Sequence, residues 1–370
     1  MILVENLFRE FSKNKIDFFC GVPDSVLKNF TNEFYKKKKV RNIILANEGS
    51  AIATGIGYYL ATKKIPAIYM QNSGLGNSLN PLISIAHDKV YKIPLLLIIG
   101  WRGAPNISDE PQHLAQGEIT TKILKLCGIK YIVLNNKKDL IKISSLISYS
   151  KKNNRIVACL IKNQVLKSKK KIEKNYQRLS KNDITRAFFV KNLLRYIKKS
   201  DKIFSSTGYL SRELYHQIKK LDLKINPFYL VGGMGHTSSV SLGHSLNSKK
   251  KIICLDGDGS FLMHLGSIVS TSKYKQKNFK YILMNNKSHE SVGGQKTNIE
   301  TINLRLFAKS VGYKKYFYLE NKRDLPKVLK NFLNNNNSGF LEVNLKRNNL
   351  ENKLPRPKDL LKIKKNFFKS

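Results

Sequence analysis

The sequence has little of the chemistry that disulfides and thiolate metal sites need. It contains four cysteines, Cys20, Cys127, Cys159 and Cys254, and none of them stands in a CxxC or Cys/His metal-binding spacing. Each lies in an apolar run or at the edge of a turn. We therefore expect buried, reduced thiols, and we exclude a disulfide framework and a cysteine-based metal site.

Long hydrophobic runs are also missing. The longest apolar stretch, Ile93–Trp101, has the length of a strand, and a membrane-spanning helix needs about 18 or more apolar residues. The first residues, MILVENLFREF, predict an amphipathic helix that contains acidic residues, not a signal peptide. We expect no membrane association and a cytoplasmic location.

Acidic residues are few: 25 Asp and Glu face 67 Lys and Arg, for a formal net charge of +42. Such an excess is typical of nucleic-acid-binding proteins. Here, however, the lysines are spread along the chain among Asn and Ile, and no RNP, zinc-finger or basic-zipper pattern is present. The composition of an AT-rich genome is the better explanation of this pattern, so a nucleic-acid partner is not expected. A positive surface would also steer an anionic substrate inward.

What the sequence does contain is a repeated alternation of strand-length apolar runs with helical stretches, within 370 residues that favour two domains. The strands expected in the first half are Asp17–Cys20, Ile43–Ala46, Ala67–Met70, Leu95–Gly100, Ile129–Leu134 and Ile156–Ile161. Those expected in the second half are Ile203–Ser206, Phe228–Val231, Ile252–Leu255, Tyr281–Met284, Tyr316–Leu319 and Phe340–Asn344. This pattern predicts an α/β protein made of two doubly wound parallel-sheet domains with no middle domain.

The polar, basic stretch 166–182 separates the two series and is expected to be a linker between domains 1–165 and 183–350. A helix is expected from Asp183 to Lys199. Residues 351–370 form a basic C-terminal tail, expected to be a surface tail or a short helix.

Two polar clusters follow neighbouring apolar runs in the second half. Gly257-Asp258-Gly259 ends the run from Ile252, and Asn285-Asn286 ends the run from Tyr281, with room for one crossover helix between them. In a parallel sheet both clusters lie at the ligand-binding edge. Glycines allow a phosphate to approach the backbone, and carboxylate and amide oxygens suit Mg²⁺. A purely structural glycine turn is the alternative.

In this arrangement the sequence resembles the thiamine diphosphate (ThDP) enzymes, whose signature is GDG, about two dozen residues, then NN. The resemblance implies ThDP and Mg²⁺ as cofactors. The Mg²⁺ ligands would be the Asp258 and Asn286 side chains and the Ser288 carbonyl. Gly257, Gly259 and Ser260 would line the diphosphate site.

Two further turns in the second half fit the same cofactor. Hydroxyls and amides around Thr207-Gly208 are suited to phosphate oxygens, at the start of an expected helix. In Gly232-Gly233-Met234-Gly235 the resemblance implies that Met234 wedges the cofactor into its bent shape and that the Gly232 carbonyl accepts from its N4′ atom. A simple turn is again the alternative.

In the first half, Glu48 follows an apolar strand and opens a run of small residues. It could be merely a helix-start carboxylate favoured by the dipole. The resemblance implies instead that Glu48 hydrogen-bonds N1′ of the ThDP aminopyrimidine. Burial would raise the carboxyl pKa and suit it to proton sharing.

Other candidates stand at strand ends. Asp24, in the turn GVPDS, is either a helix cap or the active-site aspartate that the resemblance implies. His113, in DEPQH, is a candidate catalytic or substrate-binding residue, and Asn72 a candidate cofactor contact; polar surface loops are the alternatives. Arg102, His289 and Lys296 are candidates for holding an anionic substrate.

The motifs GVPDS, ANEGSA, QNSGLGN, GWRG, DEPQH, GGMGH, GDG and HESVGGQ occur in order along nearly the whole chain. They resemble those of the ThDP-dependent 2-oxoacid decarboxylases that act on phosphonopyruvate, with the sulfopyruvate decarboxylases as near relatives. The implied reaction converts 3-phosphonopyruvate to phosphonoacetaldehyde and CO₂, in 2-aminoethylphosphonate biosynthesis. The His-His pair of pyruvate decarboxylases is absent, which speaks against pyruvate as the substrate.

Three alternatives stay open at this point: a sulfopyruvate decarboxylase, a carboligase similar to acetolactate synthase, and a nucleic-acid-binding protein that uses the basic surface. The missing middle domain speaks against the carboligase. The resemblance also implies a homodimer or larger homo-oligomer, because the family's sites lie between the first domain of one subunit and the second domain of another.

Overall fold

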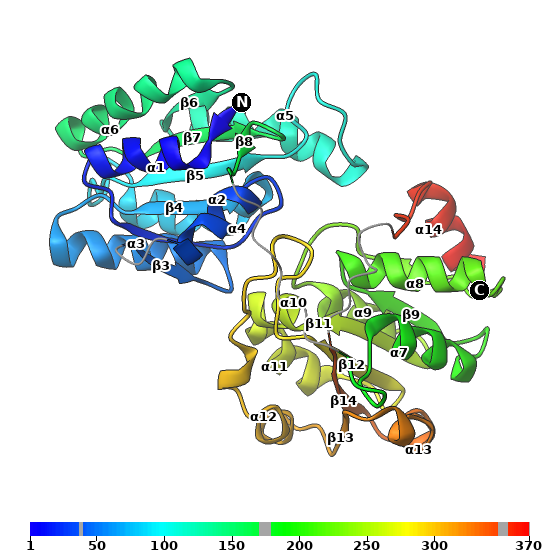
Figure 1. Cartoon of the computed structure of the whole chain (residues 1–370). Helices are drawn as coiled ribbons and strands as arrows, with labels where there is room; N and C mark the ends of the chain where they lie inside the picture. The colour runs from blue at the N-terminus through cyan, green and yellow to red at the C-terminus, as the bar shows by residue number, and fades with distance from the viewer. Residues whose placement is uncertain (37–39, 170–178, 347–353, 370) are drawn as a thin grey trace. The chain divides into compact units, whose positions relative to one another are not determined.

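The computed structural model describes residues 1–36, 40–169, 179–346 and 354–369 (Figure 1). The chain divides into two compact units, one of Met1–Glu173 with His289–Gln295 and one of Lys174–Ser288 with Lys296–Ser370. Most of the expected linker, residues 170–178, lies outside the described residues. So does the expected boundary between 350 and 351.

The first unit is built on a six-stranded parallel sheet. In spatial order its strands are β3 (Arg41–Ile44), β2 (Phe18–Gly21), β4 (Ala67–Gln71), β5 (Leu96–Trp101), β7 (Val157–Lys162) and β6 (Lys130–Leu134). A short parallel pair, β1 (Ile2–Leu3) with β8 (Leu166–Lys167), stands apart from it. The direction of winding reverses between β2 and β4, and ligands of such sheets bind outside the carboxyl ends of the strands near that point.

Helices cover both faces of this sheet. Residues of α1 (Val4–Lys13), α2 (Lys28–Glu33) and α6 (Ile141–Asn153) share one hydrophobic cluster. Residues of α3 (Glu48–Thr62), α4 (Leu75–Pro81) and α5 (Pro111–Leu126) share the other. The remaining short helical turns are η1 (Phe34–Lys36), η2 (Asn72–Gly74), η3 (Leu82–Ala86) and η4 (Lys137–Leu140).

Alternation along the strands explains the two clusters. In β5, Leu96 and Ile98 belong to one cluster, and Leu97 and Ile99 belong to the other. A strand that is buried on both faces reads as a continuous apolar run, which is why these strands could be found in the sequence.

The second unit repeats the strand order of the first. Its parallel sheet consists of β10 (Phe228–Tyr229), β9 (Lys202–Ser205), β11 (Ile252–Gly257), β12 (Phe279–Asn285), β14 (Gly339–Asn344) and β13 (Lys315–Leu319). Each predicted strand is therefore confirmed. The one predicted at Phe228–Val231 is shorter, because the chain turns away after Tyr229 into the glycine-rich loop.

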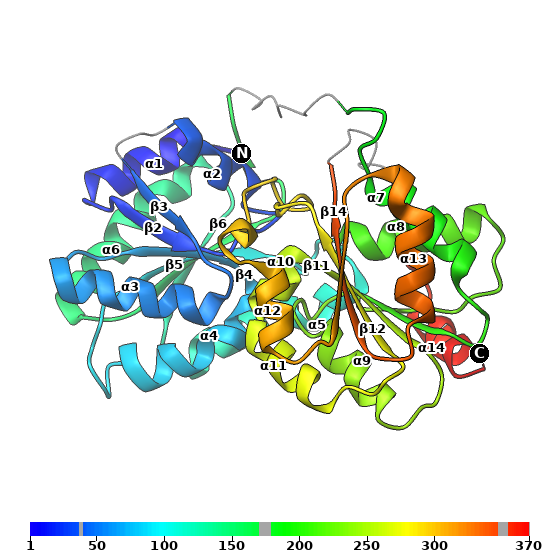
Figure 2. The ribbon, with the colours of Figure 1, turned by 90° about the horizontal axis from the view of Figure 1, so that it is seen from below.

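One cluster on this sheet contains residues of α7 (Arg186–Leu193), α8 (Tyr209–Lys220) and α13 (Leu325–Asn334). Figure 2 shows α7, α8 and α13 on the same side of the strands. The other cluster contains residues of α9 (Thr237–Ser245), α10 (Asp258–Met263), α11 (Leu265–Tyr274), α12 (Leu304–Ser310) and α14 (Leu360–Lys369). Short turns are η5 (Leu194–Tyr196), η6 (Ile299–Thr301) and η7 (Lys322–Asp324).

The expected basic tail ends in α14, and this helix is not simply a surface appendage. Phe367 is 5% exposed and packs edge-on against Phe204 and Phe228. Lys202 Nζ donates to the Phe367 carbonyl at 2.7 Å. The end of the chain thus contributes to the core of the second unit.

Two other expectations concern the whole chain. All four cysteines are free and buried, as predicted, and burial raises the pKa of the Cys20 and Cys159 thiols to about 12. Among the described residues, no helix combines the length and the apolar character needed to cross a membrane.

Candidate active site

Glu48 is the first residue of α3 and is held on several sides. Its Oε2 accepts a hydrogen bond from Asn77 Nδ2 at 2.8 Å. A Cβ added at Gly74 would lie 2.5 Å from Glu48 Cγ, so only glycine fits beside this carboxyl group. Burial raises the pKa of Glu48 above its ordinary value, against the lowering effect of the Asn77 hydrogen bond.

Asp24, in the loop after β2, is 1% exposed. Its Oδ2 accepts from the backbone N–H groups of Val26 and Leu27, at 2.9 and 3.2 Å, which is the local capping that the sequence allowed. Its Oδ1 is buried without a hydrogen-bond partner. Burial raises the pKa of Asp24 to about 6, although the positive charge of Arg102 and the backbone hydrogen bonds lower it.

Arg102, directly after β5, forms a bidentate ion pair with Asp109. Its Nε donates to Asp109 Oδ2 at 2.8 Å, and its Nη2 donates to Oδ1. Its Nη1 donates to Ser25 Oγ at 2.9 Å. The guanidinium group is therefore already paired within the first unit, which the sequence-based interpretation as a substrate-binding residue did not include.

His113, in the first turn of α5, lies 2.9 Å from the same carboxylate, measured from Nδ1 to Asp109 Oδ1. Burial and the charge of Arg102 lower the pKa of His113, against the raising effect of Asp109. Burial alone would raise the pKa of Asp109, but its hydrogen bonds with Arg102, Gly103 and His113 bring it well below its ordinary value. The structure thus brings Asp24, Arg102 and His113 into one polar network.

Asn72 is 1% exposed, and both ends of its amide group are hydrogen-bonded inside the first unit. Its Nδ2 donates to the carbonyl of Arg102 at 2.9 Å and to Thr120 Oγ1 at 2.8 Å, and its Oδ1 accepts from the Arg102 N–H at 3.1 Å. These bonds connect the end of β5 to α5. The predicted cofactor contact of Asn72 stays a prediction.

In the second unit, α8, α9 and α10 follow β9, β10 and β11, which are neighbours in the sheet. The N-termini of these helices therefore meet at one edge, where their unpaired N–H groups and dipoles favour an anion. Gly208, which precedes α8, has φ 86° and ψ −145°, a conformation that is essentially restricted to glycine. Thr207 Oγ1 donates to the Val231 carbonyl at 3.0 Å and so connects two of the loops.

The loop after β10 has a similar construction. Gly233 and Gly235 have φ values of +63° and +89°, on either side of the half-buried Met234. The Gly235 N–H donates to Ser260 Oγ at 3.0 Å, which connects this loop to the GDG helix. Gly232 to Gly235 and Gly257 to Ser260 are thus joined at the same edge of the sheet.

Asp258, the first residue of α10, is buried. Its Oδ1 accepts from the Gly259 N–H at 2.9 Å, and its Oδ2 accepts from the Ser288 N–H and from Thr297 Oγ1, both at 3.0 Å. Asn286 Oδ1 accepts from the same Ser288 N–H at 3.1 Å. The structure therefore brings Asp258, Asn286 and Ser288 together, and burial raises the pKa of Asp258 to about 6.

Two proposed substrate-binding residues follow β12. His289 is 9% exposed, and burial lowers its pKa to about 4, so it is a neutral residue at physiological pH. The Lys296 side chain is 77% exposed, with Glu300 at 4.0 Å. His289 groups with the first unit and Lys296 with the second.

Some partners were not identified as such from the sequence. Asn77 lies within the motif QNSGLGN, and it donates a hydrogen bond to Glu48 from 29 positions away. Thr297, 39 positions from Asp258, was missed entirely. Ser25 and Asp109 lie within the motifs GVPDS and DEPQH; Asp109 is seven positions from Arg102, but Ser25 is 77 positions away, so only Asp109 could have been paired with Arg102 from the sequence.

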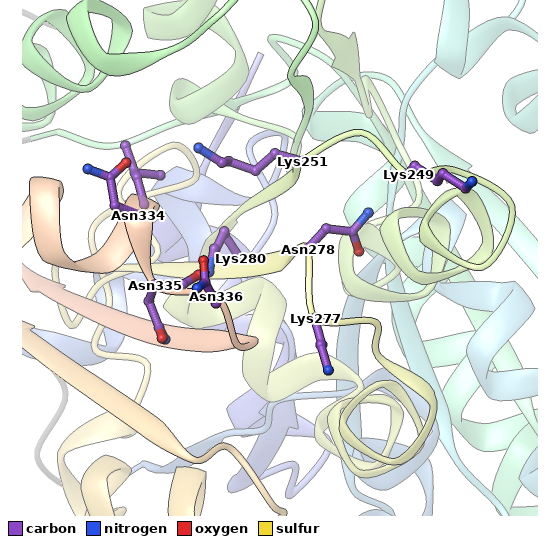
Figure 3. A pocket seen from close by; sticks show the side chains of 9 residues that line it. Lys249, Lys251, Lys277, Asn278, Lys280, Asn334, Asn335 and Asn336 are labelled. Carbon is purple, nitrogen blue, oxygen red and sulfur yellow. The ribbon is translucent and has the colours of Figure 1, made fainter.

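A cavity of about 450 Å³ lies elsewhere in the second unit (Figure 3). Its lining residues are Lys249, Lys251, Lys277, Asn278, Lys280, Leu333, Asn334, Asn335 and Asn336. Several of these residues precede β11 and β12, so the cavity is at the amino ends of these strands. It is separate from the motif residues, which stand at the carboxyl ends.

The residues present fit ThDP and Mg²⁺. In the described part of the chain, no group of three His, Cys, Asp or Glu side chains could hold a metal ion. The oxygen set of Asp258, Asn286 and the Ser288 backbone suits Mg²⁺ if phosphate oxygens complete the coordination. The buried Ser288 Oγ and Ser205 Oγ have no hydrogen-bond partner, which leaves polar atoms available at this edge.

Comparison with known families agrees with this geometry. The N-terminal TPP binding domain of thiamine pyrophosphate enzymes matches residues 1–126, and their C-terminal TPP binding domain matches residues 207–343. Thiamine pyrophosphate is another name for ThDP. The fold and the site therefore define a thiamine pyrophosphate enzyme.

Three curated relatives narrow this class. A phosphonopyruvate decarboxylase from Streptomyces viridochromogenes is 30% identical over 353 residues, covering 92% of this chain and 87% of that protein. A phosphonopyruvate decarboxylase from Streptomyces hygroscopicus is 31% identical over 309 residues, covering 80% of this chain and 75% of that protein. A sulfopyruvate decarboxylase from Methanosarcina acetivorans is 27% identical over 364 residues, covering 93% of this chain and 92% of that protein. The chain belongs to the phosphonopyruvate decarboxylase family of carboxy-lyases.

Proposed function

We propose that this protein decarboxylates 3-phosphonopyruvate to phosphonoacetaldehyde and CO₂ with ThDP and Mg²⁺, as a step of 2-aminoethylphosphonate biosynthesis. The observation that carries the proposal is the setting of Glu48, a buried carboxyl group at a helix start, fixed by Asn77 and by the missing side chain of Gly74. A merely structural helix-start carboxylate would gain more by facing water.

Each unit would hold one end of the cofactor. Glu48 would hold the aminopyrimidine, and the loops at Thr207-Gly208, Gly232–Met234 and Gly257–Ser260 would hold the diphosphate and the bent middle. Mg²⁺ would lie between the diphosphate and the oxygens of Asp258, Asn286 and Ser288. When bound, ThDP supplies the electron sink for the pair of electrons that the departing CO₂ leaves on the former keto carbon.

The remaining requirement is a proton. Decarboxylation of a 2-oxoacid to an aldehyde replaces CO₂ by one hydrogen at the former keto carbon, so the site must deliver one proton in each turnover. Asp24 suits this role because burial raises its pKa to about 6, so a fraction of it is protonated near neutral pH. Its unpartnered Oδ1 leaves one oxygen for the transfer.

Four basic residues are candidates for binding the anionic headgroup of the substrate. Lys296 carries an exposed ammonium group. Arg102 is balanced by Asp109, and His113 and His289 have lowered pKa values. We propose Lys296 as the principal cationic contact. His289 would contribute a neutral hydrogen bond.

Sulfopyruvate is the second candidate substrate, because a sulfopyruvate decarboxylase aligns with 93% of this chain. The sulfonate carries one negative charge fewer than a fully ionised phosphonate, so the cationic residues at the headgroup would decide between the two.

We also propose that the enzyme is at least a homodimer. A fully active monomer in sedimentation would contradict this.

The test is to supply ThDP and Mg²⁺ and to measure CO₂ release from phosphonopyruvate, sulfopyruvate and pyruvate side by side. We expect a strong preference for phosphonopyruvate that Glu48→Gln abolishes. A preference for sulfopyruvate would change the substrate and the pathway. No turnover of any of the three would refute the proposed reaction.

A further inference from the structure

The Asp109 carboxylate, in the loop between β5 and α5, gathers an unusual number of donors. It accepts from Arg102 Nε and Nη2, from the backbone N–H groups of Gly103 and Glu110, both at 2.8 Å, and it lies 2.9 Å from His113 Nδ1. Its side chain is only 6% exposed. An ionised carboxylate offers about four lone-pair positions, and all of them are used here.

We propose that Asp109 is a positioning residue for the reaction: it fixes His113 in the tautomer with a proton on Nδ1 and a lone pair on Nε2, and it turns Arg102 toward Ser25. This inference rests on the proposed function and adds a residue to its machinery. Asp109 itself would touch neither substrate nor cofactor.

The tautomer follows from hydrogen-bond chemistry. A carboxylate that accepts from Arg102 and from two backbone N–H groups is ionised and can only accept, so His113 Nδ1 must be the donor. In a neutral imidazole the other nitrogen then carries the lone pair. His113 therefore presents a lone pair at Nε2, and burial and the charge of Arg102 lower its pKa and so favour this neutral form.

The surrounding backbone keeps this arrangement rigid. Gly103 has φ +64°, and a Cβ there would lie 2.0 Å from the His113 carbonyl. A Cβ at Gly117 would lie 1.7 Å from the Gly103 carbonyl. Trp101 Nε1 donates to the Gly117 carbonyl at 3.0 Å. The end of β5 and the start of α5 are thus in direct backbone contact, which leaves His113 little freedom to move away from Asp109.

Arg102 connects Asp109 to the loop that contains Ser25 and Asp24. Its Nη1 donates to Ser25, the neighbour of Asp24, and its charge favours the ionised form of Asp24. The groups that face His113 in the described part of the chain include Asp109 and Arg102, whose effects on its pKa have opposite signs. One carboxylate therefore sets both the tautomer of His113 and the charge beside Asp24.

The test is Asp109→Asn, which keeps the size of the side chain but cannot accept from all of these donors. We expect kcat to fall by about 100-fold or more because the His113 ring and the Arg102 side chain beside Asp24 would both be misplaced, with a smaller change in KM. Asp109→Glu, which restores the carboxylate, should recover part of the loss.

A second readout needs no substrate. Nitrogen-15 NMR of the histidine-labelled full-length protein, with His113 assigned from the spectrum of His113→Gln, should show the Nδ1–H tautomer. The Asp109→Asn protein should show a mixture of tautomers. A wild-type His113 protonated on Nε2, or an Asp109→Asn protein with unchanged kcat, would overturn the inference.

The chain offers a matched control. Asp88 lies 2.9 Å from His87 Nδ1 and also pairs with Arg155, so it has the same kinds of partner outside the site. Asp88→Asn should leave kcat and the state of His113 unchanged, and an equal loss of kcat in both variants would overturn the positioning role. A wild-type protein that turns over no 2-oxoacid would refute the proposed function, and the positioning role with it; an active wild-type protein whose kcat and His113 tautomer do not depend on Asp109 would overturn this inference alone.

Discussion

The substitution Gly74→Ala tests most directly whether Glu48 must be where the structure places it. Gly74 ends the short helical turn after β4 and has φ −69° and ψ −12°, which alanine adopts without strain. The added methyl group would lie 2.5 Å from Glu48 Cγ and 2.7 Å from Cδ and Oε1. The effect of the change would therefore come from this contact and not from the backbone.

The size of the effect follows from these distances. Ordinary contacts begin near 3.4 Å, so the carboxyl group must move by roughly 1 Å, and a misplacement of that size costs about 100-fold in rate. The 2.8 Å hydrogen bond from Asn77 would lengthen or break. Overpacking of this kind destabilises by about 1–3 kcal/mol, which a protein of this size can tolerate.

The assay measures kcat of the ThDP- and Mg²⁺-loaded enzyme and the urea midpoint of each variant. Gly76→Ala is the matched control, because Gly76 is two residues further on in α4 and an added Cβ would meet nothing within 4 Å. It should keep full activity and gain slightly in stability, since alanine favours a helix over glycine by about 1 kcal/mol. Wild-type kcat in Gly74→Ala, or an equal loss in both variants, would refute the reasoning.

Three further predictions concern other parts of the chain. Burial raises the pKa of Asp24 from 3.8 to about 6, so its contribution to the free energy of unfolding is complete below about pH 4 and is lost as the pH rises through about 6. This change in the free energy of unfolding is on the order of 3 kcal/mol. Asp24→Asn should remove it when urea unfolding is measured as a function of pH, and an unchanged pH dependence would contradict the raised pKa of Asp24. Asp258→Asn should weaken ThDP binding in the presence of Mg²⁺ by at least about tenfold in calorimetry, because it removes the one carboxylate among the proposed ligands; wild-type affinity would exclude Asp258 as a ligand. Phe367→Ala should destabilise the protein by about 3 kcal/mol through the loss of packing in the second unit, whereas Phe368→Ala, at a side chain that is 73% exposed, should be nearly neutral, and equal effects would contradict the burial of α14.

The sequence by itself determined the architecture. Strands buried on both faces must be apolar throughout, so each strand could be found as a run, and polar clusters after those runs had to lie at the carboxyl edge of a parallel sheet. That reasoning is enough to bring Asp258 near Asn286, because Gly257 of β11 is in register with Met284 of β12. It also identified Glu48 and Asp24 as carboxylates at strand ends.

Only the tertiary structure decided which partner each of these side chains has. Glu48 of α3 with Asn77 of α4, and Asp258 of α10 with Thr297, are pairs that come together only when segments far apart in the sequence pack at the same sheet edge, and no local pattern specifies such pairs. Arg102 shows the consequence most clearly. Its position after β5 suggested an anion-binding residue, but the tight backbone contact between Gly103 and Gly117 brings Asp109 and His113 against it. The positive charge that the sequence suggested for a substrate is balanced inside the protein, because the partly buried guanidinium group forms an ion pair with the carboxylate that the fold places beside it.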